Sequence, residues 1–150
     1  MLDGTDLLHA LRLHWEYSGK DEDIANEIYA DDAVLEFPQS GERFEGVENF
    51  REWRREYGGR LKFHTRRVTH RADLVVVENL ISYDGAPWMY TVSLMEFRDN
   101  QVAHERIYIM DGWDAPEWRA PWRAERSADP APPPVEPWGD SSASSQRAPS

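Results

Sequence analysis

Three polar side chains interrupt stretches of apolar and β-branched residues, and they are the strongest candidates for chemistry. They are Asn79, Ser93 and Glu105. Side chains alternate between the two faces of a strand, so Glu105 shares its face with Ile107 and Ile109. A carboxyl group held in apolar surroundings has a raised pKa and can act as a general acid or base near neutral pH. If all three face one interior, Asn79 and Ser93 are the expected hydrogen-bond partners of Glu105.

An alternative for Glu105 is an outward position, paired with an arginine of a neighbouring strand or of a dimer partner, since ion-pair networks also perturb carboxyl groups. His64 is a weaker catalytic candidate. It lies in an expected strand over residues 61–70, where alternation does not say which face is inward. His14 stands beside Trp15 on the first expected helix, and we expect a solvated position for it.

The stretch over residues 74–110 must position the three polar residues, and it reads as three strands joined by tight turns. Asp84 with Gly85 is a strong hairpin signal, because both residues tolerate positive φ. Asp99 with Asn100 marks the second turn. The runs between the turns are rich in β-branched and aromatic residues, as a half-buried pleated surface favours.

The chain before this stretch predicts three helices and two further strands. Apolar spacing and turn residues place helices at residues 5–18, from about 21 to 29, and over 47–57, with strands at 34–37 and 61–70. Residues 39–46 are expected to form a loop. The predicted fold is α+β: a curved antiparallel sheet with three N-terminal helices covering its concave face.

The composition of the chain argues against several classes of binding partner and of chemistry. The 150-residue chain has a net charge of −11, which argues against a nucleic acid or an anionic membrane surface as a partner. It has no cysteine, which excludes disulfides, thiolate catalysis and cysteine-bound zinc. The five histidines are scattered, with no ligand spacing, so neither a metal nor a cofactor is expected. The acidic N-terminus has no basic apolar signal segment, and we expect a cytoplasmic protein.

The C-terminal part changes in character. Trp113, Trp118 and Trp122 fall in a segment expected to dock as a terminal turn or short helix. We therefore place the domain at residues 1–125. Residues 126–150 form a Pro/Ser/Ala-rich tail that is expected to be disordered, because it can bury little apolar surface. Trp138 is the tail residue that could anchor to something.

Two segments resemble the nuclear transport factor 2-like superfamily. The run over residues 28–38, followed by Gly46 and the helix around Phe50, resembles its opening, and residues 97–102 with 105–108 resemble its closing hairpin. The resemblance spans about residues 5–120 and is closest to the SnoaL-like, polyketide cyclase-like branch. It implies a cone-shaped sheet whose concave face, closed by the helices, holds an apolar pocket. It also implies a homodimer formed through the convex face, here carrying Tyr90, Val92, Leu94 and Tyr108.

The family's known carboxylates do not carry over. The two aspartic acids of ketosteroid isomerases would fall on Phe37 and Ser93, and the cyclase aspartate would fall on Ile107 or Tyr108. None of these positions holds a carboxyl group, so neither mechanism is implied for this chain. The same alignment puts Asn79, Ser93 and Glu105 on the concave face, which makes them the polar groups of the pocket.

Two functions follow from this. One is a cofactor-independent acid–base enzyme, of cyclase, isomerase or dehydratase type, acting on a hydrophobic small molecule. The other is a non-catalytic ligand-binding or dimeric interaction module of the same fold. The expected catalytic set is Glu105, His64, Asn79 and Ser93. The expected ligand-binding set is Trp15, Phe37, Phe50, Trp53, Val77, Met95 and Ile107, although simple core packing explains the aromatic members equally well.

Overall fold

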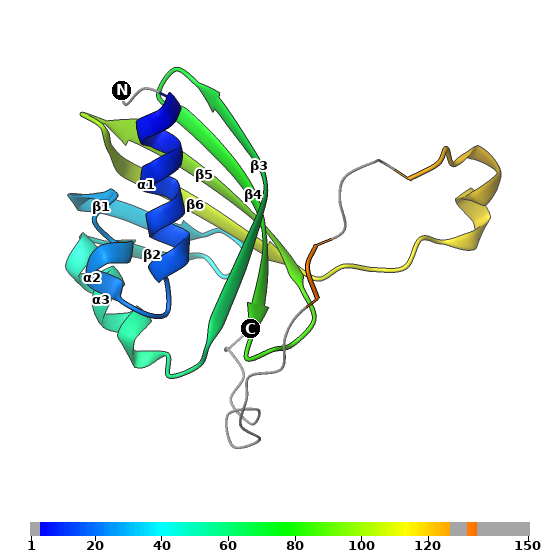
Figure 1. The fold of residues 1–150 in the computed structure, drawn as a ribbon, viewed down its shortest axis with the longest axis horizontal. Coiled ribbons are helices and arrows are strands. Elements are labelled where there is room, and N and C mark those ends of the chain that lie inside the picture. Colours follow the sequence, from blue (N-terminus) through cyan, green and yellow to red (C-terminus); the bar gives the residue numbers. More distant parts are fainter. Residues whose placement is uncertain (1–3, 127–131, 135–150) are drawn as a thin grey trace.

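A six-stranded sheet curves around the N-terminal helices in the computed structural model, which describes residues 4–126 and 132–134 (Figure 1). The strand order is β2-β1-β6-β5-β4-β3, and the sheet is open. The helices are α1 (Gly4–Tyr17), α2 (Glu22–Ala25), α3 (Val47–Glu56) and the 3-10 helix η1 (Glu117–Trp122). The strands are β1 (Tyr29–Phe37), β2 (Glu42–Glu45), β3 (Leu61–Arg71), β4 (Leu74–Tyr83), β5 (Met89–Arg98) and β6 (Gln101–Met110). The α+β architecture predicted from the sequence is confirmed.

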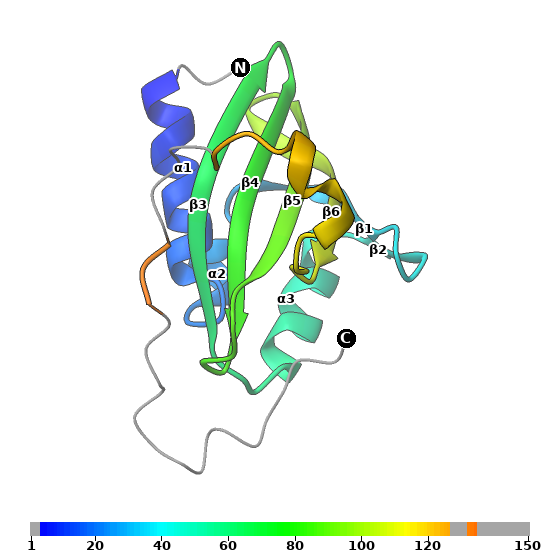
Figure 2. The ribbon, with the colours of Figure 1, turned by 90° about the vertical axis from the view of Figure 1, so that its right-hand side faces the viewer.

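Helices α1, α2 and α3 lie on the concave side of the sheet (Figures 1 and 2). Leu7 and Leu11 form the buried stripe of α1, one helical turn apart. Gly19 follows with φ of 81°, a left-handed conformation that turns the chain without a Cβ clash. Asp21 then caps α2, because its Oδ1 accepts hydrogen bonds from the amides of Asp23 and Ile24.

Strands β3 to β6 form the expected antiparallel meander. Asp84 and Gly85 at the β4–β5 turn have φ of 52° and 76°, and Asp99 and Asn100 at the β5–β6 turn have φ of 51° and 67°. Both turns therefore adopt the positive-φ geometry that Asp, Asn and Gly favour in hairpins.

The sheet differs from the expectation at its other edge. Strand β1 pairs antiparallel with β2 but parallel with β6, so the sheet is mixed rather than antiparallel throughout. The expected strand at 34–37 begins earlier, at Tyr29, and part of the expected loop is β2. Pairing with β6 explains the longer strand: the Val102 amide donates to the Ile28 carbonyl at 2.9 Å, beside the register pair of Tyr29 and Val102.

A bulge in β6 sets the direction of its side chains. Glu96 pairs with His104 and Phe97 pairs with Val102, so Ala103 is an extra residue. Strict alternation would send residues three apart to opposite faces, but the bulge lets both Val102 and Glu105 be buried. Glu105 thereby enters the same interior as the apolar core.

The core joins the helices to the concave face of the sheet. Its buried apolar members are Leu7, Leu11, Ile28, Tyr29, Ala33, Leu35, Val47, Phe50, Val75, Val77, Met95, Phe97 and Val102. Within the described residues, no helix has the length and apolar character needed to cross a membrane.

The C-terminal segment does not dock in the way that the sequence predicted. Helix η1 forms, but it buries none of its residues, and it projects from the convex side of the sheet (Figures 1 and 2). Trp113, Trp118 and Trp122 are 81%, 72% and 79% exposed. Farther along, the indole of Trp88 donates a hydrogen bond to the carbonyl of Pro133 at 3.0 Å. Most of the predicted tail, Trp138 included, lies outside the described residues.

Candidate functional site

Glu105 is a fully buried carboxyl group with two hydroxyl donors. The Ser93 hydroxyl on β5 donates to its Oε2 at 2.7 Å, and the Tyr29 hydroxyl on β1 donates to its Oε1. The sequence predicted Ser93 and Asn79 as the hydrogen-bond partners of Glu105. The contact with Ser93 is present, and the second donor is Tyr29 of β1, which the sequence did not indicate.

Burial governs the ionisation of this pair. Loss of hydration raises the pKa of Glu105, while the charge of Arg54 and the hydrogen bonds from Tyr29 and Ser93 oppose the rise without cancelling it. Burial likewise raises the pKa of Tyr29, and the neighbouring carboxyl group adds to this effect. The Tyr29 phenol therefore keeps its proton, and burial favours the protonated form of Glu105 as well.

Arg54 provides the positive charge beside this pair. Its Nη1 donates to Oδ1 of Asn26 at 2.7 Å, and its Nη2 reaches the Tyr29 hydroxyl at 3.5 Å. Its guanidinium carbon also lies 5.6, 5.9 and 5.3 Å from the ring centres of Tyr29, Phe50 and Trp53. Arg54, Tyr29 and Glu105 thus form a continuous polar chain from α3 through β1 to β6.

His14 is buried, contrary to the expected solvated position. Its side chain is 4% exposed, and Nδ1 lies 2.5 Å from the Ala25 carbonyl, so Nδ1 carries the proton. The pKa of His14 is lowered to about 3, mainly by burial and also by the charge of Arg54, while the backbone hydrogen bond to Ala25 acts in the opposite direction. The imidazole is therefore neutral. Its ring packs edge-on against Tyr29, with ring centres 5.4 Å apart.

Asn79 enters the interior but does not bond to Glu105. It is 2% exposed on β4, opposite Thr91 of β5, and its Oδ1 is buried without a hydrogen-bond partner. A buried acceptor left unpaired is costly, so a donor at this point would stabilise the interior. The expected contact between Asn79 and Glu105 is replaced by the contact with Tyr29.

His64 lies apart from this group. It pairs with Leu80 across β3 and β4, and Leu80 pairs with Tyr90 of β5. Directly opposed residues share a face of a sheet, so His64 lies on the convex face with Tyr90. Its ring centre is 6.4 Å from that of Trp88. The structure does not bring His64 together with Glu105.

The expected ligand-binding residues occupy two environments. Phe50, Val77 and Met95 have no exposed surface and belong to the core. The other four are partly buried and pack against that core: Trp15, Phe37, Trp53 and Ile107. Phe37 and Trp53 form an aromatic cluster with Phe44, and the buried indole nitrogen of Trp53 has no hydrogen-bond partner.

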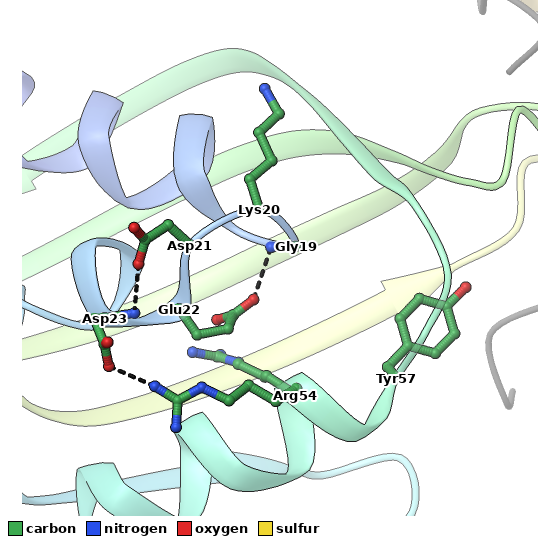
Figure 3. A pocket seen from close by; sticks show the side chains of 8 residues that line it. Gly19, Lys20, Asp21, Glu22, Asp23, Arg54 and Tyr57 are labelled. Atoms are coloured by element: carbon green, nitrogen blue, oxygen red, sulfur yellow. Dashed lines mark hydrogen bonds and ion pairs between the residues drawn. The ribbon is translucent and has the colours of Figure 1, made fainter. Parts of the chain in front are cut away.

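A polar cavity of about 320 Å³ lies on the outer side of Arg54, between the turn that follows α1 and the end of α3 (Figure 3). Its lining residues are Gly19, Lys20, Asp21, Glu22, Asp23, Arg54, Arg55 and Tyr57. None of the residues predicted from the sequence to bind a ligand lines it. Within residues 4–126 and 132–134, no group of three or more His, Asp or Glu side chains is arranged to hold a metal ion.

The sequence did not indicate Tyr29 and Arg54 as members of the polar chain, or Asn26 as the partner of Arg54. Arg54 had a detectable signal, because it follows Phe50 by four residues, and that spacing puts both on one face of a helix. The sequence predicts Tyr29 at the end of the second helix, but it lies at the start of β1, and this position directs its hydroxyl to Glu105.

Comparisons with known proteins agree with this architecture. The SnoaL-like domain family matches residues 11–105. An NTF-2 like protein of unknown function from Burkholderia xenovorans is 39% identical, with a TM-score of 0.75 over 82% of this chain and 97% of that one. No match was found among curated proteins.

More distant structures share the fold. A protein named as a candidate ketosteroid isomerase from Kribbella flavida is 20% identical, with a TM-score of 0.68 over 87% of this chain and 93% of that one. A candidate polyketide cyclase from Sinorhizobium meliloti is 21% identical, with a TM-score of 0.58 over 71% of this chain and 99% of that one. At these identities the likeness concerns the fold, which by itself does not specify a reaction.

Proposed function

Because the chain belongs to the SnoaL-like family, in the NTF2-like fold, we propose that the interior of its cone binds a hydrophobic small molecule and performs acid–base chemistry on it. The reaction would be of cyclase, isomerase or dehydratase type and would need no cofactor. Glu105 is the proton-transferring group in this proposal. Tyr29 and Ser93 hold its two oxygens, and Asn79 offers a hydrogen-bond acceptor to the ligand.

The observation that carries this proposal is the buried carboxyl group of Glu105 on the concave face, with a raised pKa and two hydroxyl donors. Burying a carboxyl group destabilises a fold unless its oxygens are bonded. Acid–base catalysis gives a reason for keeping one, since a carboxyl group with a raised pKa exchanges protons near neutral pH. Asn79 adds to this argument, because its unpaired Oδ1 lies in the same interior.

A non-catalytic ligand-binding or interaction module is the second candidate. It is favoured by the closed packing around Phe50, Val77 and Met95, which leaves these side chains no exposed surface. Homodimerisation through the convex face belongs to both candidates. Tyr90 on that face is 41% exposed, and its neighbours Val92, Leu94 and Tyr108 are half-buried in the single chain. The cytoplasmic location stays a prediction.

Native mass spectrometry of the purified protein tests ligand binding directly. A co-purified apolar compound that survives gentle ionisation and is released on unfolding supports the proposal and provides a substrate to assay. On that compound, Glu105→Gln should reduce turnover by at least about a hundredfold, the lower end of what a general acid or base contributes.

Glu16→Gln is the matched control, since it removes an exposed carboxylate on α1. If Glu105→Gln turns the compound over as fast as the control does, Glu105 is structural. The binding-module candidate would then hold.

A further inference from the structure

We propose that the cavity between residues 19–23 and the end of α3 binds a small molecule carrying a carboxylate, with Arg54 as the main donor (Figure 3). Lys20 is a second positive charge of the lining, although its side chain extends away from Arg54 in the structure. This site is distinct from the buried Glu105 site. It lies on the outer side of Arg54, and the proposal does not depend on the acid–base chemistry proposed above.

The acidic residues of the cavity wall are engaged within the protein. Asp21 accepts the two backbone hydrogen bonds that cap α2. One oxygen of Glu22 accepts from the amide of Gly19 at 2.7 Å, and the other accepts from the Asn26 side chain at 3.0 Å. Asp23 pairs with Arg55 at 2.5 Å. All three carboxylates are therefore occupied by groups of the fold.

The basic side chains Lys20 and Arg54 are less engaged within the protein than the three carboxylates are. Among the described residues, Lys20 has no side-chain hydrogen bond or ion pair, and Arg54 has no ion pair. The hydrogen bonds of Arg54 go to neutral oxygens, those of Asn26 and Tyr29. A guanidinium group has five N–H donors in a planar fork that matches a carboxylate, so Arg54 keeps donors available for a ligand.

Glu105 attracts Arg54 from the interior, and Glu22 is the carboxylate of the cavity lining that competes for the same charge. Glu22 acts on Arg54 electrostatically, yet both of its oxygens are directed to other donors. An incoming carboxylate can therefore reach Arg54 without displacing a hydrogen bond that the structure contains. Glu22 weakens the attraction of the cavity for anions, and its neutralisation should strengthen binding.

The size of the cavity and one of its walls indicate the kind of carboxylate. A volume of about 320 Å³ is at the lower end of the range for small-molecule sites. Tyr57 provides an aromatic side chain at one end, and its hydroxyl is fixed to Asp84 by a 3.0 Å hydrogen bond. A single-ring aromatic acid matches these features, and benzoate is the simplest probe.

The test is a titration of the full chain with benzoate. The NMR chemical shifts of the Gly19 and Lys20 amides and of the Arg54 side chain report the binding. Benzamide is the uncharged analogue. Benzoate should bind at least about tenfold more tightly, since it adds a charge-assisted contact with a guanidinium. Lys20→Gln should weaken benzoate binding severalfold, and Arg54→Lys should weaken it at least about tenfold, because the forked geometry is lost.

Arg12→Gln is the matched control, because Arg12 is an exposed α1 cation outside the cavity lining. It should leave the affinity for benzoate unchanged. Glu22→Gln should increase that affinity, which separates a site effect from general damage to the fold. Equal binding of benzoate and benzamide, equal effects of Lys20→Gln and Arg12→Gln, or full affinity in Arg54→Lys would each overturn the proposal. None of these binding measurements depends on the turnover of Glu105→Gln. Either proposal, the carboxylate site or the acid–base function, can therefore be refuted while the other stands.

Discussion

The hydroxyl group of Tyr29 on β1 donates a hydrogen bond to the carboxyl group of Glu105 on β6, between two strands that run parallel. The residues are 76 positions apart in the chain. The contact requires two features together: β1 must begin as early as Tyr29, and the bulge at Ala103 must direct Glu105 inward. The candidate site is therefore a product of the parallel edge of the sheet.

Glu105 should make folding stability fall as the pH rises. Its pKa in the folded protein is raised above the ordinary value of 4.5, so folding favours the protonated form. The stabilisation is complete below pH 4.5 and is lost as the pH rises through the folded pKa. Urea unfolding at several pH values should show this slope, and Glu105→Gln should remove it. Persistence of the slope in Glu105→Gln, with Glu16→Gln as the control, would assign it to another group.

Tyr29→Phe should destabilise the fold by about 1–3 kcal/mol, because it leaves a buried carboxyl oxygen without its donor. It should also raise the pKa of Glu105 further, since the Tyr29 hydrogen bond favours the ionised form. Chemical denaturation measures the first effect, and the pH dependence of stability reports the second. Tyr17→Phe, at a half-buried position on α1, is the control. A stability change no larger than that of Tyr17→Phe would show that the hydrogen bond between Tyr29 and Glu105 contributes little.

The strands and turns were predictable because local chemistry determines them. Asp84 with Gly85 and Asp99 with Asn100 adopt the positive φ that their residue types favour. The inward faces of β4 and β5 followed from alternation, and Asn79, Thr91 and Ser93 are buried as that rule requires.

The hydrogen bonds of the site were predictable only in part. The contact of Ser93 with Glu105 followed from alternation, but the contact of Tyr29 with Glu105 depends on the parallel pairing of β1 with β6, which no local pattern encodes. The burial of His14 depends on the contact of its ring with the Ala25 carbonyl after the α1–α2 turn. Trp113, Trp118 and Trp122 were expected to dock because they are apolar, yet residue type does not specify a surface to dock on.

His14 should act on stability in the direction opposite to Glu105. Its pKa is lowered from 6.5 to about 3, so the unfolded chain binds the proton more readily. The contribution of His14 to stability should be complete above pH 6.5 and should fall below that pH by about 1.4 kcal/mol per pH unit. His14→Gln should flatten this part of the pH profile. His9→Gln is the control, because His9 is exposed on the same helix. Identical profiles for the two variants would assign the acid sensitivity to another group.

The domain boundary near residue 125 can be tested by limited proteolysis. Cleavage within residues 126–150 should leave a folded core, because η1 buries none of its residues and the core ends with β6. Mass spectrometry of the fragments and a thermal melt of the truncated chain measure this. A truncation at residue 126 that unfolds the protein would show that the contact of Trp88 with Pro133, or another tail contact, is required.

Dimerisation through the convex face should be sensitive to charge at its centre. Leu94 is half-buried in the single chain, between Val76 of β4 and Arg106 of β6. Leu94→Glu would force a carboxylate into the proposed interface, and burying an unpaired charge there costs several kcal/mol. Sedimentation at micromolar concentration should give a dimer for the wild type and a monomer for Leu94→Glu. Leu8→Glu should remain dimeric, because Leu8 is 56% exposed on α1, across the sheet from the convex face. A wild-type monomer would refute the dimer, and a dimeric Leu94→Glu would place its interface on another surface, such as the exposed tryptophans of the C-terminal segment.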